Sequence, residues 1–512
     1  MPVSRGMNTS RGLASGSKPN VLIVLCGVVA VAVMDLSVVN VALPSIQQDL
    51  RLAPADVQWV VVTYGIAVAG LLMLGGRLGD LFGHRRVLCV GLSVLVMASA
   101  VGGLADSLTI LILARAGQGI GAAWAVPNAL AILSRTFAEG PERTRALGIF
   151  GAAGGTSALV GSIAGGLLVE GPGWPWVFFI NVPLGVLIVA GATRLIPADT
   201  ATSVLHARLD VLGAVSLTTG LASLALGVHQ TVDNELLSPA VDLPVALGIV
   251  MLLVFAAVES RIVHPLIPIG TLSRPSLLWA NVCTGLMWAS FLGLIFAGTL
   301  FTQDELGWSP LQAGSSTIPI AVLSIVANAV LAPRVMTRLG PATTLAVGLL
   351  VMTVGLALLV RVPSNASFLL DLAPAYSLLG LGLGLAEVGA QVAAFTGVRD
   401  DEAGIAGGAL ETAREMGGAL GVAVLAAAAV AGTSPTDSYH RIAVGAALLA
   451  LAGSVVAGTL LRQAARPPTA DESHAVAVPE NVAATRHTAR DRGGNPVPPP
   501  RCGDQRPQPS AV

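Results

Sequence analysis

The sequence has too few charged residues for a soluble protein of its length. Only 11% of its 512 residues are Asp, Glu, Lys or Arg, whereas soluble proteins carry about 25% because their surfaces face water. Hydrophobic residues make up 54% of the chain, or about 276 residues. At ~20 residues per crossing, this number is sufficient for roughly fourteen membrane helices. The composition therefore excludes a string of soluble domains and predicts an all-α polytopic membrane protein.

Lysine is nearly absent, since Lys18 is the only one. An ATP-binding P-loop needs the pattern G-x-x-x-x-G-K-[ST], and Lys18 is followed by Pro19. The chain therefore has no ATPase of its own, and concentrative transport must use an ion gradient. One elementary charge crossing 100 mV releases ~2.3 kcal/mol, and each unit of pH gradient adds about 1.4 kcal/mol.

Cysteine and histidine are also sparse. The four cysteines fit neither a disulfide framework nor a zinc spacing. The seven histidines are scattered, without an H-E-x-x-H or H-x-x-x-H pattern, and no G-x-S-x-G occurs. The net charge of −1 offers no basic face for nucleic acid. We therefore expect no enzyme activity, no cofactor, no metal site and no nucleic-acid partner.

Fourteen apolar runs are long enough to cross a membrane. The first lacks a small-residue cleavage site and exceeds the apolar core of a signal peptide, so we expect it to be retained. The expected spans are 21–43, 57–76, 87–105, 109–133, 147–169, 177–196, 209–229, 243–261, 276–299, 311–332, 342–361, 372–396, 404–430 and 441–461.

Basic residues are distributed unequally between alternate connections. The N-terminal tail and the even loops hold sixteen, namely Arg5, Arg11, Lys18, Arg77, Arg85, Arg86, Arg135, Arg143, Arg145, Arg194, Arg208, Arg261, Arg274, Arg334, Arg338 and Arg399. The odd loops hold three, namely Arg51, Arg361 and Arg441. Because basic loops stay in the cytoplasm, both termini are expected there, with an even number of helices.

The two halves of the chain resemble each other at an offset of 257 residues, which carries Gly83 onto Gly340. Parallel six-helix repeats are typical of transporters whose halves rock around a central site. We expect an arrangement of six, two and six helices. The segments are a cytoplasmic N-terminal tail (1–20), a six-helix bundle (21–196), a two-helix insert (197–275), a second six-helix bundle (276–461) and a disordered cytoplasmic tail (462–512). The last is rich in Pro and Arg and cannot bury enough apolar surface to fold.

The connection after the second span carries five residues of interest, namely Gly76, Asp80, Gly83, Arg85 and Arg86. The glycines allow a tight turn, and the arginines hold the loop at the cytoplasmic surface. The pattern resembles the signature between helices 2 and 3 of the major facilitator superfamily, although Leu81 and His84 replace residues that are commonly basic. In that family the aspartate, here Asp80, acts as a conformational latch by bonding to the neighbouring helix terminus.

Further stretches resemble the fourteen-helix drug:proton antiporters of this superfamily over residues 21–461. They are Asp35–Pro44 in helix 1, Gly173–Gly185 at helix 6 and Leu306–Gly314 before helix 10. Helix 5 is similar to the antiporter pattern G-x8-G-x3-G-P-x2-G-G through Gly148, Gly161, Gly165 and Gly166. Ser157 replaces a glycine of that pattern and Ser162 replaces its proline, so the usual proline kink is not expected.

The resemblance implies a proton-coupled antiporter that exports a small amphipathic drug or antibiotic by alternating access. Its expected partners are a small-molecule substrate, protons and the lipid bilayer, and we expect it to work as a monomer. The preference for Arg over Lys indicates GC-rich, bacterial coding, which implies the bacterial cytoplasmic membrane. Export of an endogenous metabolite, lipid or siderophore remains open, as does proton-coupled import.

Asp35 and Arg115 are charged residues within apolar spans. An ionisable residue inside the membrane is a functional hypothesis by default because its burial is costly. Asp35 lies ~12 Å and Arg115 ~9 Å below the outer ends of helices 1 and 4, and the corresponding helices line the central cavity in the family. Desolvation favours a protonated carboxyl, whereas a nearby arginine favours the charged form. We predict that the two residues couple transport to protons, with a permanent structural ion pair as the alternative.

A second cluster contains Glu387 in helix 12 and Glu411, Arg414 and Glu415 in helix 13. Glu411 lies ~10 Å and Glu387 ~13 Å from the cytoplasmic ends of their helices. Glu411 neighbours Arg414 and Glu415 on one helix face, so Arg414 offsets only part of the negative charge. We interpret this group as a structural charge network, with proton coupling as the alternative.

The loop charges make a testable prediction about topology. Reporter fusions after Arg338 and within residues 463–512 should behave as cytoplasmic, and a fusion after Asp304 as external, because the basic loops stay inside. An external C-terminal tail would overturn the predicted orientation.

Overall fold

The computed structural model describes residues 18–53, 55–137, 141–197, 210–231, 234, 238–261, 274–396, 398, 403–430, 432 and 434–464. The regular elements of this part are all helical. A helix bonds its own backbone groups internally, which a segment within lipid must do because the bilayer core offers no water. The fold class predicted from the sequence is therefore confirmed.

The N-terminal half of the chain begins with α1 (Lys18–Asp49), α2 (Trp59–Phe82), α3 (His84–Gly103), α4 (Leu108–Thr136), α5 (Pro141–Glu170), α6 (Pro175–Phe179) and α7 (Asn181–Leu195). The next two helices are α8 (Val211–Gln230) and α9 (Pro239–Glu259).

The C-terminal half contains α11 (Pro275–Leu300), η1 (Phe301–Glu305), α12 (Pro310–Ser316), α13 (Ile318–Val326), η2 (Ala327–Leu331), α14 (Ala332–Leu339), α15 (Pro341–Leu359), η3 (Phe368–Leu372), α16 (Ala373–Phe395), α17 (Ala403–Val430), α18 (Pro435–Val456), η5 (Ala457–Leu461) and α19 (Arg462–Ala464).

Each expected span corresponds to a helix or to a run of consecutive helices. Within the described residues, thirteen such segments are long and apolar enough to cross a membrane. The remaining expected span is α17, a helix of 28 residues. Several helices are longer than the apolar runs, and α1 continues through Pro44 to Asp49. The orientation of the termini and the segment boundaries remain predictions, and the tail from residue 465 lies outside the described part.

Two segments that were expected to be loops are mostly helical. α2 and α3 are separated by Gly83 alone, and α14 and α15 by Gly340 alone. Both glycines adopt positive φ angles, 97° and 78°, which residues with a side chain rarely adopt. The sequence offset therefore marks two equivalent helix breaks, one in each half.

The start of α12 follows from its sequence. Ser309 caps the helix and Gln312 bonds back to it, which forms a capping box, while Pro310 occupies the first helical position. Gly307 precedes the cap with a φ of 65°. The stretch Leu306–Gly314 is thus a helix-initiation signal.

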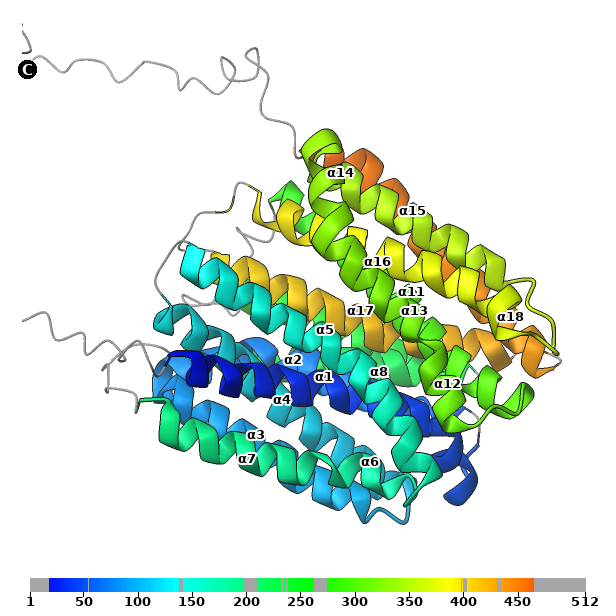
Figure 1. Cartoon of the computed structure of the whole chain (residues 1–512), viewed down its shortest axis with the longest axis horizontal. Helices are drawn as coiled ribbons and strands as arrows, with labels where there is room; N and C mark the ends of the chain where they lie inside the picture. Colours follow the sequence, from blue (N-terminus) through cyan, green and yellow to red (C-terminus); the bar gives the residue numbers. More distant parts are fainter. Residues whose placement is uncertain are drawn as a thin grey trace, which may run out of the picture. The chain divides into compact units, whose positions relative to one another are not determined.

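The helices α1–α7 pack on one another, and so do the helices of the C-terminal half (Figure 1). In the first group, α1 packs on α5, and α4 packs on both α2 and α3. In the second, α15 packs on α16 and α18, and α11 packs on α17 and α18. The groups meet where α2 contacts α17 and where α5 contacts α12.

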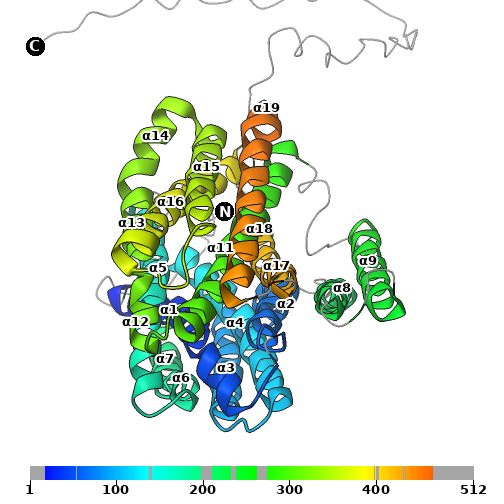
Figure 2. The ribbon, with the colours of Figure 1, turned by 90° about the vertical axis from the view of Figure 1, so that its right-hand side faces the viewer.

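The pair α8 and α9 lies at the side of α2 and α17 (Figure 2). α8 contacts α2 and α17, whereas α9 packs mainly on α8. Leu243, Leu247 and Leu253 of α9 are 47–69% exposed, as suits side chains that face lipid.

Candidate functional site

Asp35 and Arg115 form a fully buried ion pair. Arg115 Nη1 lies 2.5 Å from Asp35 Oδ2, and both residues are 0% exposed. Asp35 Oδ1 accepts hydrogen bonds from Gln118 Nε2 at 2.7 Å and from Asn181 Nδ2 at 2.5 Å. Charge-assisted bonds of this kind are about twice as strong as neutral ones. Three donors from α4 and α7 therefore surround one carboxylate of α1.

The guanidinium of Arg115 is held on its other sides as well. Its Nε donates to the carbonyl of Val60 at 2.7 Å, and Nη1 also donates to Gln118 Oε1 at 2.9 Å. The group stacks over the ring of Tyr64, 4.5 Å from the ring centre, a contact that attracts a cation. α2 thus contributes both a carbonyl and an aromatic face to the charge pair.

Small residues in α4 bring the neighbouring helices close to this network. A Cβ atom at Gly119 would overlap Tyr64 and Ala67 of α2, and one at Gly121 would overlap Gly91 of α3. Close approach through small residues is typical of membrane helix packing. It also lets Gln118 Nε2 donate to Ser99 Oγ of α3 at 2.8 Å.

Asp80 lies near the end of α2 that the predicted topology places in the cytoplasm. Three basic side chains surround it. Its oxygens are 3.7 Å from Arg77 Nη1, 3.5 Å from His84 Nε2 and 3.9 Å from Arg135 Nη2. Asp80 is 43% and Arg135 65% exposed, and ion pairs this exposed contribute at most about 1 kcal/mol. They can form and break at little cost, as the expected latch would require.

His84 connects this surface cluster to the interior. It is 3% exposed, and its Nδ1 lies 2.7 Å from Asn128 Oδ1. Asn128 uses Nδ2 to donate to the carbonyls of Gly75 and Trp124, so its oxygen is the acceptor and His84 Nδ1 is the donor. His84 Nε2 is left facing Asp80.

The other expected residues of this connection have separate roles. Gly83 forms the helix break, and the side chain of Arg85 donates to the carbonyl of Thr193 in α7. Arg86 is exposed. A Cβ at Gly76 would meet only Pro127, at 3.9 Å, whereas one at Gly79 would overlap the side chains of Asn128 and His84. Gly79, which sequence reasoning did not select, is thus one of the glycines that allow the close approach of α2 and α4, together with Gly75.

Three of the four selected glycines of α5 make close helix contacts. Cβ atoms at Gly161 and Gly165 would meet the backbone of α1 at Met34 and Val38, and one at Gly166 would overlap Leu311 of α12. Gly148 has nothing within 4 Å. Ser162 bonds to the carbonyl of Ala158 within the helix, at 3.1 Å.

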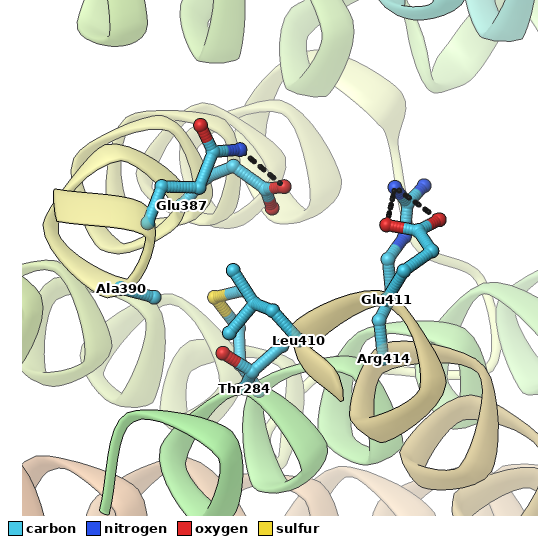
Figure 3. A pocket seen from close by; sticks show the side chains of 8 residues that line it. Thr284, Glu387, Ala390, Leu410, Glu411 and Arg414 are labelled. Carbon is cyan, nitrogen blue, oxygen red and sulfur yellow. Dashed lines mark hydrogen bonds and ion pairs between the residues drawn. The ribbon is translucent and has the colours of Figure 1, made fainter. Parts of the chain in front are cut away.

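The structure brings Glu387, Glu411 and Arg414 to one small cavity (Figure 3). Arg414 Nη1 lies 3.2 Å from Glu411 Oε1, and its guanidinium stacks 4.0 Å from the centre of the Trp288 ring. Glu387 accepts a bond from Gln391 Nε2 at 3.4 Å. Glu415 does not line this cavity, and its backbone lies near Gly65 of α2.

A sequence profile of the Major Facilitator Superfamily matches residues 25–422. The chain belongs to this superfamily. It is therefore a bacterial multi-pass membrane transporter and not an enzyme, in agreement with its helices and its relatives.

Curated relatives within the superfamily are named for antibiotic export and resistance. The cephamycin export protein of Amycolatopsis lactamdurans is 37% identical over 458 residues, which cover 88% of this chain and 94% of the relative. The puromycin resistance protein of Streptomyces alboniger is 36% identical and covers 82% of this chain and 83% of its own.

Solved structures show the same fold. The POT family transporter PepTSo aligns with a TM-score of 0.65 at 14% identity, covering 88% of this chain and 99% of its own. An auto-inhibited POT family peptide transporter aligns with a TM-score of 0.63 at 16% identity, covering 86% of this chain and 97% of its own. At this identity the likeness concerns the fold alone.

Sequence reasoning brought Asp35 and Arg115 together but missed their neutral partners. Asn181 lies within the stretch Gly173–Gly185 and Gln118 follows Arg115 by three residues, yet a neutral side chain carries no burial cost large enough to single it out. His84 was recognised only as a departure from the loop pattern. Its burial beside Asn128 could not be inferred without knowing how α4 is oriented about its own axis.

The two neighbouring glycines of α2 give a matched test. Gly79→Ala should lower the free energy of unfolding by about 1–3 kcal/mol, because the new methyl group overlaps the buried Asn128 side chain. Gly76→Ala should leave stability unchanged or slightly higher, because alanine favours helix and space is available. Melting curves of the purified variants provide the measurement, and equal losses would contradict the packing argument.

Proposed function

We propose that the protein exports an amphipathic drug or antibiotic from the bacterial cell in exchange for protons, by alternating access. Its relatives named for antibiotic export and resistance support the substrate class. The observation that supports proton exchange is the fully buried Asp35 carboxylate, which is surrounded by donors.

Protonation of Asp35 would disrupt the network that surrounds it. The charged carboxylate accepts from all three donors, whereas a protonated carboxyl must itself donate one bond. The attraction to Arg115 would also be lost, which leaves a buried guanidinium with less compensation. A single proton thus has a large effect on the packing of α1 against α4.

Asn181 is suited to accommodate the added proton. Its Nδ2 donates to Asp35, while its Oδ1 is buried without a hydrogen-bond partner. Turning the amide by half a rotation would exchange donor and acceptor, so that Asn181 Oδ1 accepts from the protonated Asp35. The amide group can therefore serve both charge states of the carboxyl.

The same stretch of α1 is linked to the second six-helix group. Met34 precedes Asp35 and packs against Gly161 of α5, and Val38, three residues after Asp35, packs against Gly165. The next glycine of α5, Gly166, packs against Leu311 of α12. A shift of α1 upon protonation would thus move α5 relative to α12, which is one of the contacts between the halves.

The proposal predicts proton movement in inverted membrane vesicles. Adding a transported drug should release accumulated protons, and transport should stop when an uncoupler collapses the gradient. Asp35→Asn should abolish this proton release, with at least a tenfold lower drug-dependent signal. Asp106→Asn, an exposed position between α3 and α4, is the matched control and should behave as wild type.

Three results distinguish the interpretations. Uptake that persists without any proton gradient would refute proton exchange. Normal pH-dependent export by Asp35→Asn would remove Asp35 from the coupling site. Failure of that variant to accumulate in the membrane would favour a structural ion pair, because removing one partner of a buried pair costs about 3–5 kcal/mol.

A further inference from the structure

The cavity between α11, α16 and α17 has features of a ligand site. It has a volume of about 30 Å³, and its polar lining comes from Thr284, Glu387, Gln391, Glu411 and Arg414 (Figure 3). A space of this size admits one or two groups as large as a water molecule. It therefore fits the polar end of a molecule but not a whole drug.

The carboxylates in this cavity are unequally compensated. Glu411 is paired with Arg414, whose guanidinium is also held against Trp288. Glu387 is bonded to the amide of Gln391 and forms no ion pair with any described residue. Two carboxylates therefore share one guanidinium in the cavity, and only one of them is paired with it. Glu387 is thus the carboxylate that a bound cation could pair with.

Thr284 provides an independent indication of a ligand. Its side chain lines the cavity and is 3% exposed, and its Oγ1 has no hydrogen-bond partner. Buried hydroxyl groups in proteins are nearly always hydrogen-bonded. A threonine in a helix ordinarily bonds to its own backbone, as Thr353 does to the carbonyl of Leu349. The free oxygen of Thr284 is therefore available to a group that enters the cavity.

We propose that this cavity binds the protonated amine of a cationic amphipathic substrate, with Glu387 and Thr284 accepting its hydrogen bonds. An ammonium group carries three donors and no acceptor, which matches a carboxylate and an unpartnered hydroxyl oxygen. Met287 and Leu410 supply apolar lining for the carbon atoms beside the nitrogen. This inference rests on the proposed export of drugs and names the charge of the substrate.

An open surface of α16 adjoins the ammonium cavity. It is formed by Gln391, Val392, Phe395 and Thr396, all of which are exposed. Gln391 belongs to both spaces. The apolar body of a substrate whose amine occupies the smaller cavity can extend over Val392 and Phe395.

Fluorescence titration of the full-length protein in nanodiscs tests this site. The probes are dansylcadaverine, which has a primary ammonium group, and its neutral N-acetylated form. Wild type should bind the amine at least tenfold more tightly, since hydrogen bonds to a charged group of this strength change affinity by a factor of about ten or more. Glu387→Gln keeps the shape but removes the charge, and should abolish this preference. Thr284→Val should weaken amine binding about three- to tenfold.

Matched variants and the neutral probe control for folding. Glu305→Gln and Thr353→Val change the same residue types outside the cavity, and both should retain the wild-type preference. Unchanged binding of the acetylated probe to Glu387→Gln would show that this variant is folded. If Glu387→Gln does not accumulate, Thr284→Val supplies the same comparison.

Equal affinity of wild type for both probes, or an unchanged preference in Glu387→Gln, would overturn the proposal. Displacement of the amine by sodium at constant ionic strength would also overturn it, by assigning the site to an inorganic cation. Binding is measured without a proton gradient, so the result is independent of proton exchange. Amine preference without proton release in vesicles would refute the proposed antiport and leave this site intact.

Discussion

The N-terminal half depends on keeping two opposite charges, Asp35 and Arg115, completely out of water. Removing an ion pair from water is costly, and the attraction compensates only when the remaining donors and acceptors are satisfied. Here the partners come from α1, α2, α3, α4 and α7, while Arg115 Nη2 and Asn181 Oδ1 have no hydrogen-bond partner. The network around the charge pair therefore connects five helices. The glycines of α4 are the means by which the backbones approach closely enough.

Tyr64 connects this pair to the other half of the chain. Its ring lies under Arg115, and its hydroxyl donates to the carbonyl of Ala32. The following residue, Gly65, contacts Ala419 of α17, one turn beyond Glu415. Rearrangement of Arg115 would thus act on the very surface of α2 that meets α17. Two of the contacts between the halves, α2 with α17 and α5 with α12, lie one helix away from the charge pair, and α1 itself contacts α11 and α12.

The sequence predicted the fold well because membrane helices are specified locally. Each span needs about 20 apolar residues, and the breaks at Gly83 and Gly340 use the positive φ angles that glycine adopts readily. Depth along a helix is also readable from the sequence, since each residue rises 1.5 Å, and this arithmetic placed Asp35 at the level of Arg115. Rotation about the helix axis is set by packing between distant segments. For that reason the polar partners Asn181, His84 and Thr284 emerged only from the structure.

The two charged groups differ in ways that suit different tasks. Asp35 and Arg115 balance each other, are 0% exposed and have their carboxylate fully bonded. Such a group responds to the gain of one proton because every bond around the carboxylate changes. The C-terminal group has three carboxylates against one guanidinium, and Arg414 and Glu411 are 27% and 39% exposed. A carboxylate without an ion-pair partner beside an open surface offers a binding position for a cation. The enclosed pair is therefore suited to proton exchange, and the exposed group to recognition of a positively charged substrate.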